Sequence, residues 1–158
     1  MGKRSDLPAL NPSTVPAREG SNYPPPYAPQ VAGRRKRPLG DAAGLTQFGV
    51  NLVELPPGCW SSQRHWHSHE DEFVWVVDGE LVLVTDAGEQ VLGPGMAAGF
   101  PAGRADGHHL INRTDRPARY LEVGTRIPED EAVYSDIDME LRLRDGDHVY
   151  VRKSGEPY

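Results

Sequence analysis

The sequence predicts an all-β domain, built as a sandwich or a closed barrel, with an extended arm in front of it. Three observations predict this class. From about residue 45 the chain alternates between short runs rich in β-branched and aromatic residues and clusters of turn residues. No stretch shows a sustained helical period. Many short, closely spaced strands favour a closed arrangement, because closure removes exposed strand edges.

Nine runs are expected to form strands. They are residues 45–55, 73–77, 80–84, 90–92, 97–100, 108–111, 118–123, 140–143 and 148–151. Asp78-Gly79 and Asp145-Gly146 each lie between two apolar runs, and both pairs predict tight hairpin turns. The acidic segment 127–140 remains open, because its first residues fit either the first turn of a short helix or a solvated loop.

Residues 1–38 form a proline-rich, basic arm, and residues 39–158 form the single predicted domain. Eight of the 15 prolines lie in the arm, where they disfavour both a helix and a central strand. The arm carries seven Lys/Arg and two Asp/Glu, a balance of +5, whereas the rest carries ten and 21, a balance of −11. Such an arm can pack across its own domain or a partner subunit, with Tyr23 and Tyr27 as candidate anchors.

Composition excludes several classes of function. The net charge of −6 disfavours broad nucleic-acid binding, which needs a basic surface. The basic run 34–37 is interpreted as a solvated linker. Cys59 is the only cysteine, which fits a reducing compartment, and no apolar run reaches the length of a membrane span. We therefore expect a cytoplasmic protein that binds neither nucleic acid nor a membrane.

Five of the six histidines lie in two short clusters whose spacing suits a metal ion. His65 and His67 are one residue apart, so on a strand they point to the same side. Glu72 follows shortly after, and the second cluster supplies His108 and His109. Unpaired polar groups inside a barrel would each cost several kcal/mol, and a metal removes that cost. The alternative is a hydrogen-bonded histidine cluster without metal.

Both clusters lie in motifs that resemble those of the cupin superfamily, and the resemblance covers residues 45–124. The first motif, residues 58–79, is matched by Gly58, His65, His67, Glu72 and Gly79. The second motif, residues 95–112, is matched by Gly95, Pro101, Gly103, His108 and Asn112.

Each motif departs from the family pattern in one spacing. Gly58 is one residue further from His65 than usual. Four residues instead of two separate Gly103 from His108, which makes His109 a competing candidate. The preserved spacing from His108 to Asn112 favours His108.

The resemblance implies a cupin-type double-stranded β-helix, a jelly-roll barrel, with one divalent metal ion (Fe, Mn, Ni or Zn) inside its mouth. It implies His65, His67, Glu72 and His108 as the ligands. Glu72 would be a ligand that can also release to act as a catalytic base. The resemblance further implies a homodimer, with the arm crossing to the partner.

Other residues near the motifs have two readings each. His69 continues the alternation and would support a ligand or replace one, but an exposed turn residue is the favoured interpretation. His148 is expected at the surface or in packing. Trp66 could line a ligand pocket, but by strand alternation it points away from the histidine pair, which favours outer-face packing or a dimer contact. Arg104 and Asp106 lie in the insertion, as substrate contacts or as a plain surface loop.

The predicted function is a metal-dependent enzyme on a small molecule, either a dioxygenase or an isomerase or lyase. Three imidazoles and one carboxylate leave open positions on a six-coordinate ion, where a substrate or dioxygen can bind. Fe(II) would favour the dioxygenase, and Mn, Ni or Zn the isomerase or lyase. The alternative is a non-catalytic module that binds a sugar or a carboxylate, since a fold alone does not supply catalysis.

Overall fold

The computed structural model describes residues 8–158, and within them the chain is built almost entirely from β-strands. The strands are β1 (Arg18–Glu19), β2 (Arg35–Pro38), β3 (Phe48–Leu55), β4 (His65–His67), β5 (Glu72–Asp78), β6 (Leu81–Thr85), β7 (Gly88–Leu92), β8 (Ala97–Phe100), β9 (His109–Ile111), β10 (Ala118–Thr125), β11 (Ala132–Tyr134), β12 (Glu140–Arg144) and β13 (Asp147–Val151). Short helical turns are η1 (Pro12–Thr14), η2 (Pro25–Tyr27), η3 (Pro29–Val31) and α1 (Leu39–Ala43).

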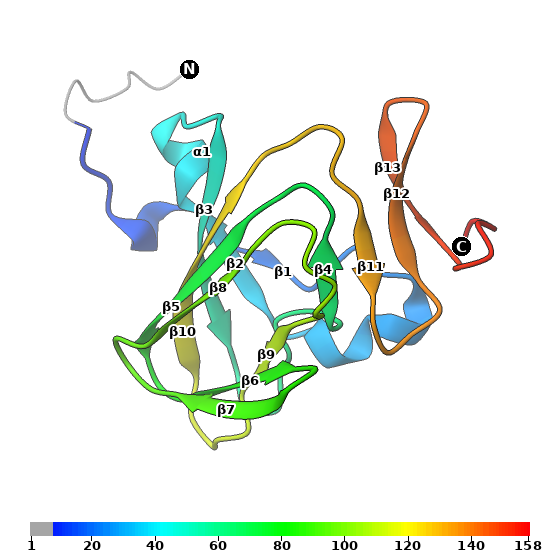
Figure 1. The fold of residues 1–158 in the computed structure, drawn as a ribbon. Coiled ribbons are helices and arrows are strands. Elements are labelled where there is room, and N and C mark those ends of the chain that lie inside the picture. Colours follow the sequence, from blue (N-terminus) through cyan, green and yellow to red (C-terminus); the bar gives the residue numbers. More distant parts are fainter. Residues whose placement is uncertain (1–7) are drawn as a thin grey trace.

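The strands form three antiparallel sheets that enclose a common interior (Figure 1). A six-stranded sheet has the order β1-β2-β3-β10-β5-β8, a three-stranded sheet the order β7-β6-β9, and a four-stranded sheet the order β13-β12-β11-β4. Figure 1 shows the three-stranded sheet across the bottom of the view and the four-stranded sheet along the right side. The all-β, jelly-roll class predicted from the sequence is confirmed.

Alternation along the central strand pair explains the core. β3 and β10 pair over their full length, from Phe48 opposite Thr125 to Leu55 opposite Ala118. Leu55 and Ala118 are buried at the inward positions of this ladder. The core continues with further buried apolar side chains from β5, β6, β7 and β9, namely Val74, Val76, Leu81, Leu83, Leu92 and Leu110. The same alternation places the polar side chains of Asn51 and Glu122, which are paired across β3 and β10, on one face of the sheet.

Each of the nine predicted runs contains a strand, but two strands near the site are absent from the prediction. β4 and β11 are three residues long and pair with each other. A segment of three residues is too short for its alternation to stand out in a sequence. The start of the acidic segment is a turn at Pro128–Glu129 that leads into β11. The helix interpretation is therefore wrong, and the solvated-loop interpretation fits only the turn itself, because Asp130, Ala132 and Tyr134 are buried.

One of the two predicted hairpins is wrong. β5 pairs with β10 and β8, whereas β6 pairs with β7 and β9, so Asp78-Gly79 connects two different sheets. Gly79 has φ = +77°, and a Cβ there would lie 2.7 Å from the Cα of Ala118. The tight turn is thus a corner of the barrel. Asp145-Gly146 does close the predicted hairpin between β12 and β13, with positive φ at both residues.

The proline-rich arm packs on its own domain. β2 adds to the edge of the six-stranded sheet by pairing with β3, and β1 pairs with β2. The ring of Tyr23 lies 5.6 Å from the rings of both Tyr134 and Tyr150 in edge-on contacts. Tyr27 meets the ring of Tyr158 at 5.8 Å. Both tyrosines predicted as anchors therefore hold the arm, and a domain boundary at residue 38 stays a prediction.

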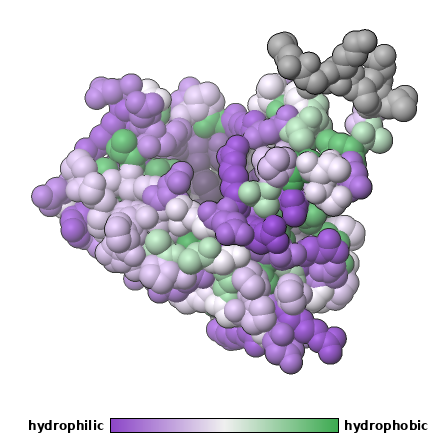
Figure 2. All heavy atoms as spheres, turned by 180° about the vertical axis from the view of Figure 1, so that it is seen from behind, coloured by the Kyte–Doolittle hydropathy of each residue, from purple (hydrophilic) through white to green (hydrophobic). Residues whose placement is uncertain are grey.

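The surface seen from behind is mostly hydrophilic, with hydrophobic side chains in small groups and a hollow near its upper centre (Figure 2). Such scattered hydrophobic residues are ordinary on a globular domain. Within residues 8–158, the helices are all too short or too polar to cross a bilayer.

Candidate metal centre

The backbone joins the two histidine clusters directly. The amide of His108 donates to the carbonyl of His65 at 2.9 Å, and the amide of His65 donates back to the carbonyl of His108 at 3.3 Å. The Arg64 guanidinium also donates to the carbonyl of Gly107 at 2.9 Å. Segments 43 residues apart in sequence, counted from 65 to 108, therefore lie side by side at the mouth of the barrel.

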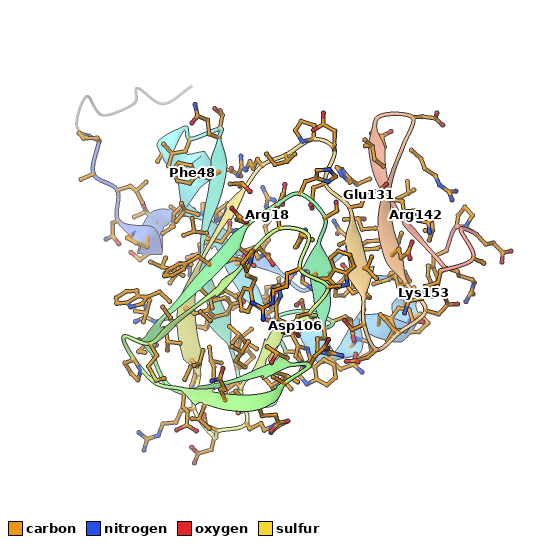
Figure 3. The ribbon with its side chains drawn as sticks, in the orientation of Figure 1. Arg18, Phe48, Asp106, Glu131, Arg142 and Lys153 are labelled. Atoms are coloured by element: carbon orange, nitrogen blue, oxygen red, sulfur yellow. The ribbon has the colours of Figure 1, made fainter. Side chains whose placement is uncertain are left out.

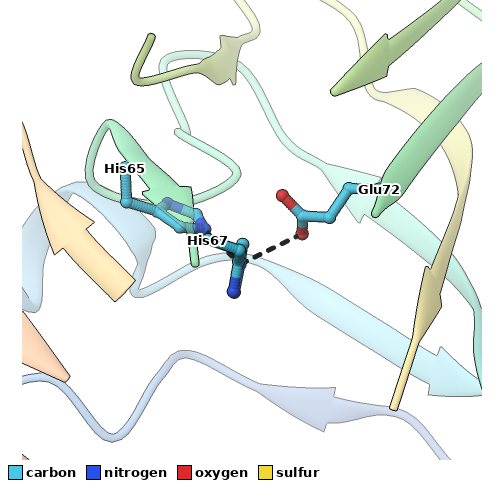
Figure 4. A group of neighbouring side chains, drawn as sticks. All are labelled: His65, His67 and Glu72. Carbon is cyan, nitrogen blue, oxygen red and sulfur yellow. Dashed lines mark hydrogen bonds and ion pairs between the residues drawn. The ribbon is translucent and has the colours of Figure 1, made fainter. Parts of the chain in front are cut away.

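The four predicted ligands meet at this point. His65 Nε2 lies 3.1 Å from His67 Nε2, and His67 Nε2 lies 3.4 Å from Glu72 Oε1. Figure 4 shows the two imidazoles of β4 facing the carboxylate that begins β5. His108 Nε2 lies 2.6 Å from the other oxygen, Glu72 Oε2. His65, His67 and Glu72 have donor atoms within 4.8 Å of one another, and His108 joins this group through Glu72.

Two imidazole rings are held so that Nε2 faces the centre. His65 Nδ1 lies 2.8 Å from the carbonyl oxygen of Gln63, which can only accept, so Nδ1 carries the proton. His67 Nδ1 lies 2.6 Å from Asp130 Oδ2. His108 Nδ1 is buried without a hydrogen-bond partner among the described residues. Its ring is held instead by stacking on Phe100, with ring centroids 3.6 Å apart.

Electrostatics sets the protonation of this group. Burial lowers the pKa of His65 to about 4, although the Glu72 charge opposes the shift. Burial also lowers the pKa of His67, but hydrogen bonds and charges from Glu72 and Asp130 outweigh it and raise the pKa to about 9. Burial raises the pKa of Glu72, but hydrogen bonds from His108 and His67 hold it well below its usual range. A cationic partner thus stabilises the carboxylate, which is the role a metal ion can take over.

The donor set fits a divalent metal ion. Imidazole nitrogen and carboxylate oxygen are accepted by Fe, Mn, Ni and Zn alike. The Nδ1 contacts of His65 and His67 direct both Nε2 atoms toward the centre, where a metal ion would displace the proton that the raised pKa leaves on His67. These residues can therefore hold a metal, while the assignment of all four ligands stays a prediction.

The remaining histidines lie outside this group. His109, the competing candidate, turns the other way, with Nδ1 2.9 Å from the carbonyl oxygen of Ser62 and its ring edge-on to Trp60. His69 is exposed in a bend, as its favoured interpretation predicted. His148 is exposed on β13, with Nε2 2.7 Å from the backbone oxygen of Asp130.

A cavity of about 250 Å³ opens onto His67, Glu72 and His108. Its walls come from β4, β6, β7 and β8, from the connection between β4 and β5, and from the loop before β9. They include Trp66, Glu70, Leu83, Gln90, Phe100, Arg104 and Asp106. Figure 3 places Asp106 near the middle of the molecule, on the loop between β8 and β9. The inserted loop therefore borders the cavity, as the substrate-contact interpretation requires.

Of the interpretations of Trp66, the structure supports a place in the cavity lining beside His67. β4 lies at the edge of its sheet and is only three residues long. At this end of the sheet the indole contributes to the cavity rim.

Sequence reasoning missed two residues that shape the site. Asp130 is 5% exposed and contacts His67, although it lies in a segment predicted as a helix start or a loop. Arg64 precedes His65 directly and binds Asp86, Asp136 and Gly107. Arg64 lies within the first motif but at none of its matched positions, Asp130 lies outside both motifs, and the partners of both residues are distant in sequence. The only available signal was the excess of carboxylates in 127–140.

Comparisons with known proteins agree with this geometry. The family model described as a cupin domain matches residues 51–124. No curated protein matches the chain. Among solved structures, a protein from Silicibacter pomeroyi named a sugar phosphate isomerase from a cupin superfamily is 48% identical, with a TM-score of 0.88 and 96% of each chain covered.

Two further structures are more distant. A putative sugar phosphate isomerase from Acidithiobacillus ferrooxidans is 29% identical, with a TM-score of 0.73 over 80% of this chain and 81% of that one. A polyketide cyclase from Streptomyces resistomycificus is 25% identical, with a TM-score of 0.61 over 79% of this chain and 80% of the other. The likeness extends across nearly the whole chain only in the first of the three.

Proposed function

The chain belongs to the cupin superfamily, and we propose on this basis that it is a metal-dependent enzyme that isomerises a small phosphorylated sugar. In this proposal His65, His67, Glu72 and His108 bind one divalent ion, which is Fe, Mn, Ni or Zn. The observation that carries the proposal is the convergence of imidazole and carboxylate donors at one wall of a cavity.

The size of the cavity supports a small substrate, and Arg104 in its lining offers a site for a phosphate group. About 250 Å³ is close to the lower end of ligand pockets, which start at roughly 300 Å³. Arg104 is the only Lys or Arg among the described residues that line it. A guanidinium can bind a phosphate through two parallel hydrogen bonds. Two similar structures, from Silicibacter pomeroyi and Acidithiobacillus ferrooxidans, carry the name sugar phosphate isomerase.

Isomerisation of a sugar moves hydrogen within one molecule, so it requires no external oxidant. A divalent ion bound here would polarise a substrate oxygen as a Lewis acid. The residues of the chain would position the substrate and move the proton. Glu72 is the proposed base, after release as a ligand, and Glu70 is a second carboxylate on the cavity wall. One Glu70 oxygen is held by the amide of Ile127 at 2.9 Å, which leaves the other oxygen available.

The test begins with metal-free protein reconstituted separately with Fe(II), Mn, Ni and Zn. Each sample is incubated with pentose and hexose phosphates, and ¹H NMR follows interconversion of aldose and ketose forms. We expect turnover with at least one metal, none without metal, and none in His67→Ala. Metal binding without turnover of any sugar phosphate would contradict the proposed reaction.

Two other outcomes correspond to the alternatives predicted from the motifs. Oxygen consumption by the iron form with a small organic substrate would indicate a dioxygenase. Saturable binding of a sugar or a carboxylate without chemical change would indicate a non-catalytic binding module. Each assay uses the same reconstituted samples, so the three functions are compared under one set of conditions.

We also propose a cytoplasmic homodimer that binds neither nucleic acid nor a membrane. Phe73 and Trp75 support the dimer, because they point outward from the six-stranded sheet and are 45% and 41% exposed. The single cysteine is buried and unpaired, which fits a reducing compartment. Light scattering on the wild type and on Trp75→Glu tests the dimer. A monomeric wild type would contradict it.

A further inference from the structure

Asp130 places a buried carboxylate behind the candidate metal centre. Its side chain is 7% exposed, and both oxygens are used. Oδ2 lies 2.6 Å from His67 Nδ1. Oδ1 accepts the backbone amides of His69 and Glu70, at 2.9 and 3.0 Å. The carboxylate therefore binds the imidazole of His67 and also the chain that follows it.

The loop that carries Asp130 is tied to the strand that carries His67. The amide of Ser68 donates to the carbonyl of Glu131, and the amide of Glu131 donates to the hydroxyl of Ser68, both at 2.8 Å. On the far side of the loop, His148 Nε2 donates to the backbone oxygen of Asp130 at 2.7 Å. Hydrogen bonds on both sides of the loop therefore fix the position of the Asp130 carboxylate. It cannot move away from the His67 ring unless these hydrogen bonds break.

We propose that Asp130 is the positioning residue for His67, a conclusion that rests on the proposed metal site. An ionised carboxylate only accepts hydrogen bonds, so its contact keeps the proton on Nδ1. Nε2, which faces His65 and Glu72, is then the nitrogen left to bind a metal ion. A carboxylate behind a ligand imidazole also fixes the ring orientation and raises its basicity, and loss of such a partner typically weakens metal binding about 10–100-fold.

A direct role for Asp130 as a ligand is disfavoured by its own contacts. His67, Glu70 and Asp130 do form a second group of donors within 4.8 Å. Within this group, however, Asp130 has both oxygens occupied, and one oxygen of Glu70 accepts the amide of Ile127. A metal there would compete with four existing hydrogen bonds. The same ring of His67 also offers only Nδ1 on this side.

Asp130→Asn tests the role with little disturbance of the loop. An asparagine keeps one carbonyl oxygen that can accept from His69 and Glu70, but it replaces the oxygen facing His67 with a donor NH₂. Glu129→Gln is the matched control, because it makes the same change of charge on an exposed neighbour in the same turn. Dissociation constants for Zn and Mn are measured by chelator competition on the full chain, with circular dichroism to check the fold.

We expect Asp130→Asn to weaken metal binding about 10–100-fold, and Glu129→Gln to leave it within twofold of the wild type. Equal affinity in a folded Asp130→Asn protein would overturn the inference. A wild type that binds no metal would instead contradict the proposed function. The inference would then be tested by the protonation state of the His67 ring in the metal-free protein, which is measured separately.

The protonation of the two His67 ring nitrogens is measured by ¹⁵N NMR of histidine-labelled, metal-free protein. We expect a hydrogen-bonded proton on His67 Nδ1 in the wild type and in Glu129→Gln, and its loss in Asp130→Asn. This measurement reports which nitrogen of the His67 ring carries the proton. A general loss of rigidity would not transfer the proton from one nitrogen to the other. Absence of that proton in the wild type would overturn the inference even if the variant fails to fold.

Discussion

His65 and His108 are neighbours in a two-bond antiparallel bridge, with each amide donating to the other's carbonyl at 3.3 and 2.9 Å. This pairing brings the first and second histidine clusters to one place before any metal is considered. Arg64 reinforces it, since its guanidinium bonds both to Gly107, beside His108, and to Asp136. Backbone hydrogen bonds therefore help to position the side chains of the candidate metal centre.

Replacement of His67 by alanine should remove most of the bound metal. His67 supplies a nitrogen 3.4 Å from Glu72 and 3.1 Å from His65, so its loss takes away the central donor. His69→Ala is the control, because His69 is exposed two positions away. Elemental mass spectrometry on untagged protein is the measurement. Equal metal content in wild type and His67→Ala would show that the ion binds elsewhere.

Metal affinity should rise with pH in the neutral range. The pKa of His67 is raised to about 9 in the metal-free protein, because its bonds to Glu72 and Asp130 outweigh burial. A metal must displace that proton, so one proton is released on binding and the affinity should increase about tenfold per pH unit up to about pH 9. Isothermal titration in buffers of different ionisation enthalpy measures the proton release. A flat affinity profile from pH 6.5 to 9 would contradict this linkage.

The same shift predicts the pH dependence of stability without metal. A histidine whose folded-state pKa is raised contributes stability fully below its unfolded value of about 6.5 and loses the contribution as pH rises through about 9. The difference in free energy of unfolding between wild type and His67→Gln should therefore shrink over that interval. Urea unfolding of both proteins in the presence of a chelator gives this difference. If the difference in free energy of unfolding between the two proteins instead grew as the pH rises, the raised pKa could not belong to His67.

Arg104→Gln should raise KM for a phosphorylated substrate more than it lowers kcat. Arg104 lines the cavity on an exposed loop, so its removal should weaken phosphate binding without moving the metal ligands. A lost charge-assisted hydrogen bond costs about 1.5–3 kcal/mol, equivalent to roughly a 10–150-fold change. Arg116→Gln, on a different exposed turn, is the control. Unchanged KM in Arg104→Gln would exclude a phosphate contact.

Gly79→Ala should destabilise the fold strongly. The corner between β5 and β6 requires φ = +77°, and a Cβ there would meet backbone and side-chain atoms of Ala118 at 2.7 Å. Strain and overpacking together should cost about 2 kcal/mol or more. Gly93→Ala should be nearly neutral, because a Cβ at Gly93 meets nothing within 4 Å. Chemical denaturation of both variants measures the difference. Similar stability of the two would mean that the corner can relax.

Much of the fold could be predicted because its signals are local. The continuous apolar, β-branched run in 73–77 and the partial alternation in 118–123 identify strands wherever they lie in space, since both signals depend only on the chain itself. Asp78-Gly79 was recognisable as a turn for the same reason. Its role as a corner was not, because a turn residue does not say whether the next strand pairs with the last one or with another sheet.

The candidate site divides in the same way. The sequence by itself determined the donor chemistry, since His65, His67 and Glu72 lie within eight residues and strand alternation places the two imidazoles together. Only the tertiary structure shows that His108 contacts Glu72 whereas His109 turns toward Ser62, because the inserted loop leaves the alignment of the second motif ambiguous in the sequence. Only the tertiary structure brought Asp130 behind His67, 63 residues earlier in the chain. Contacts of this kind depend on how sheets pack, and packing joins residues that no local pattern connects.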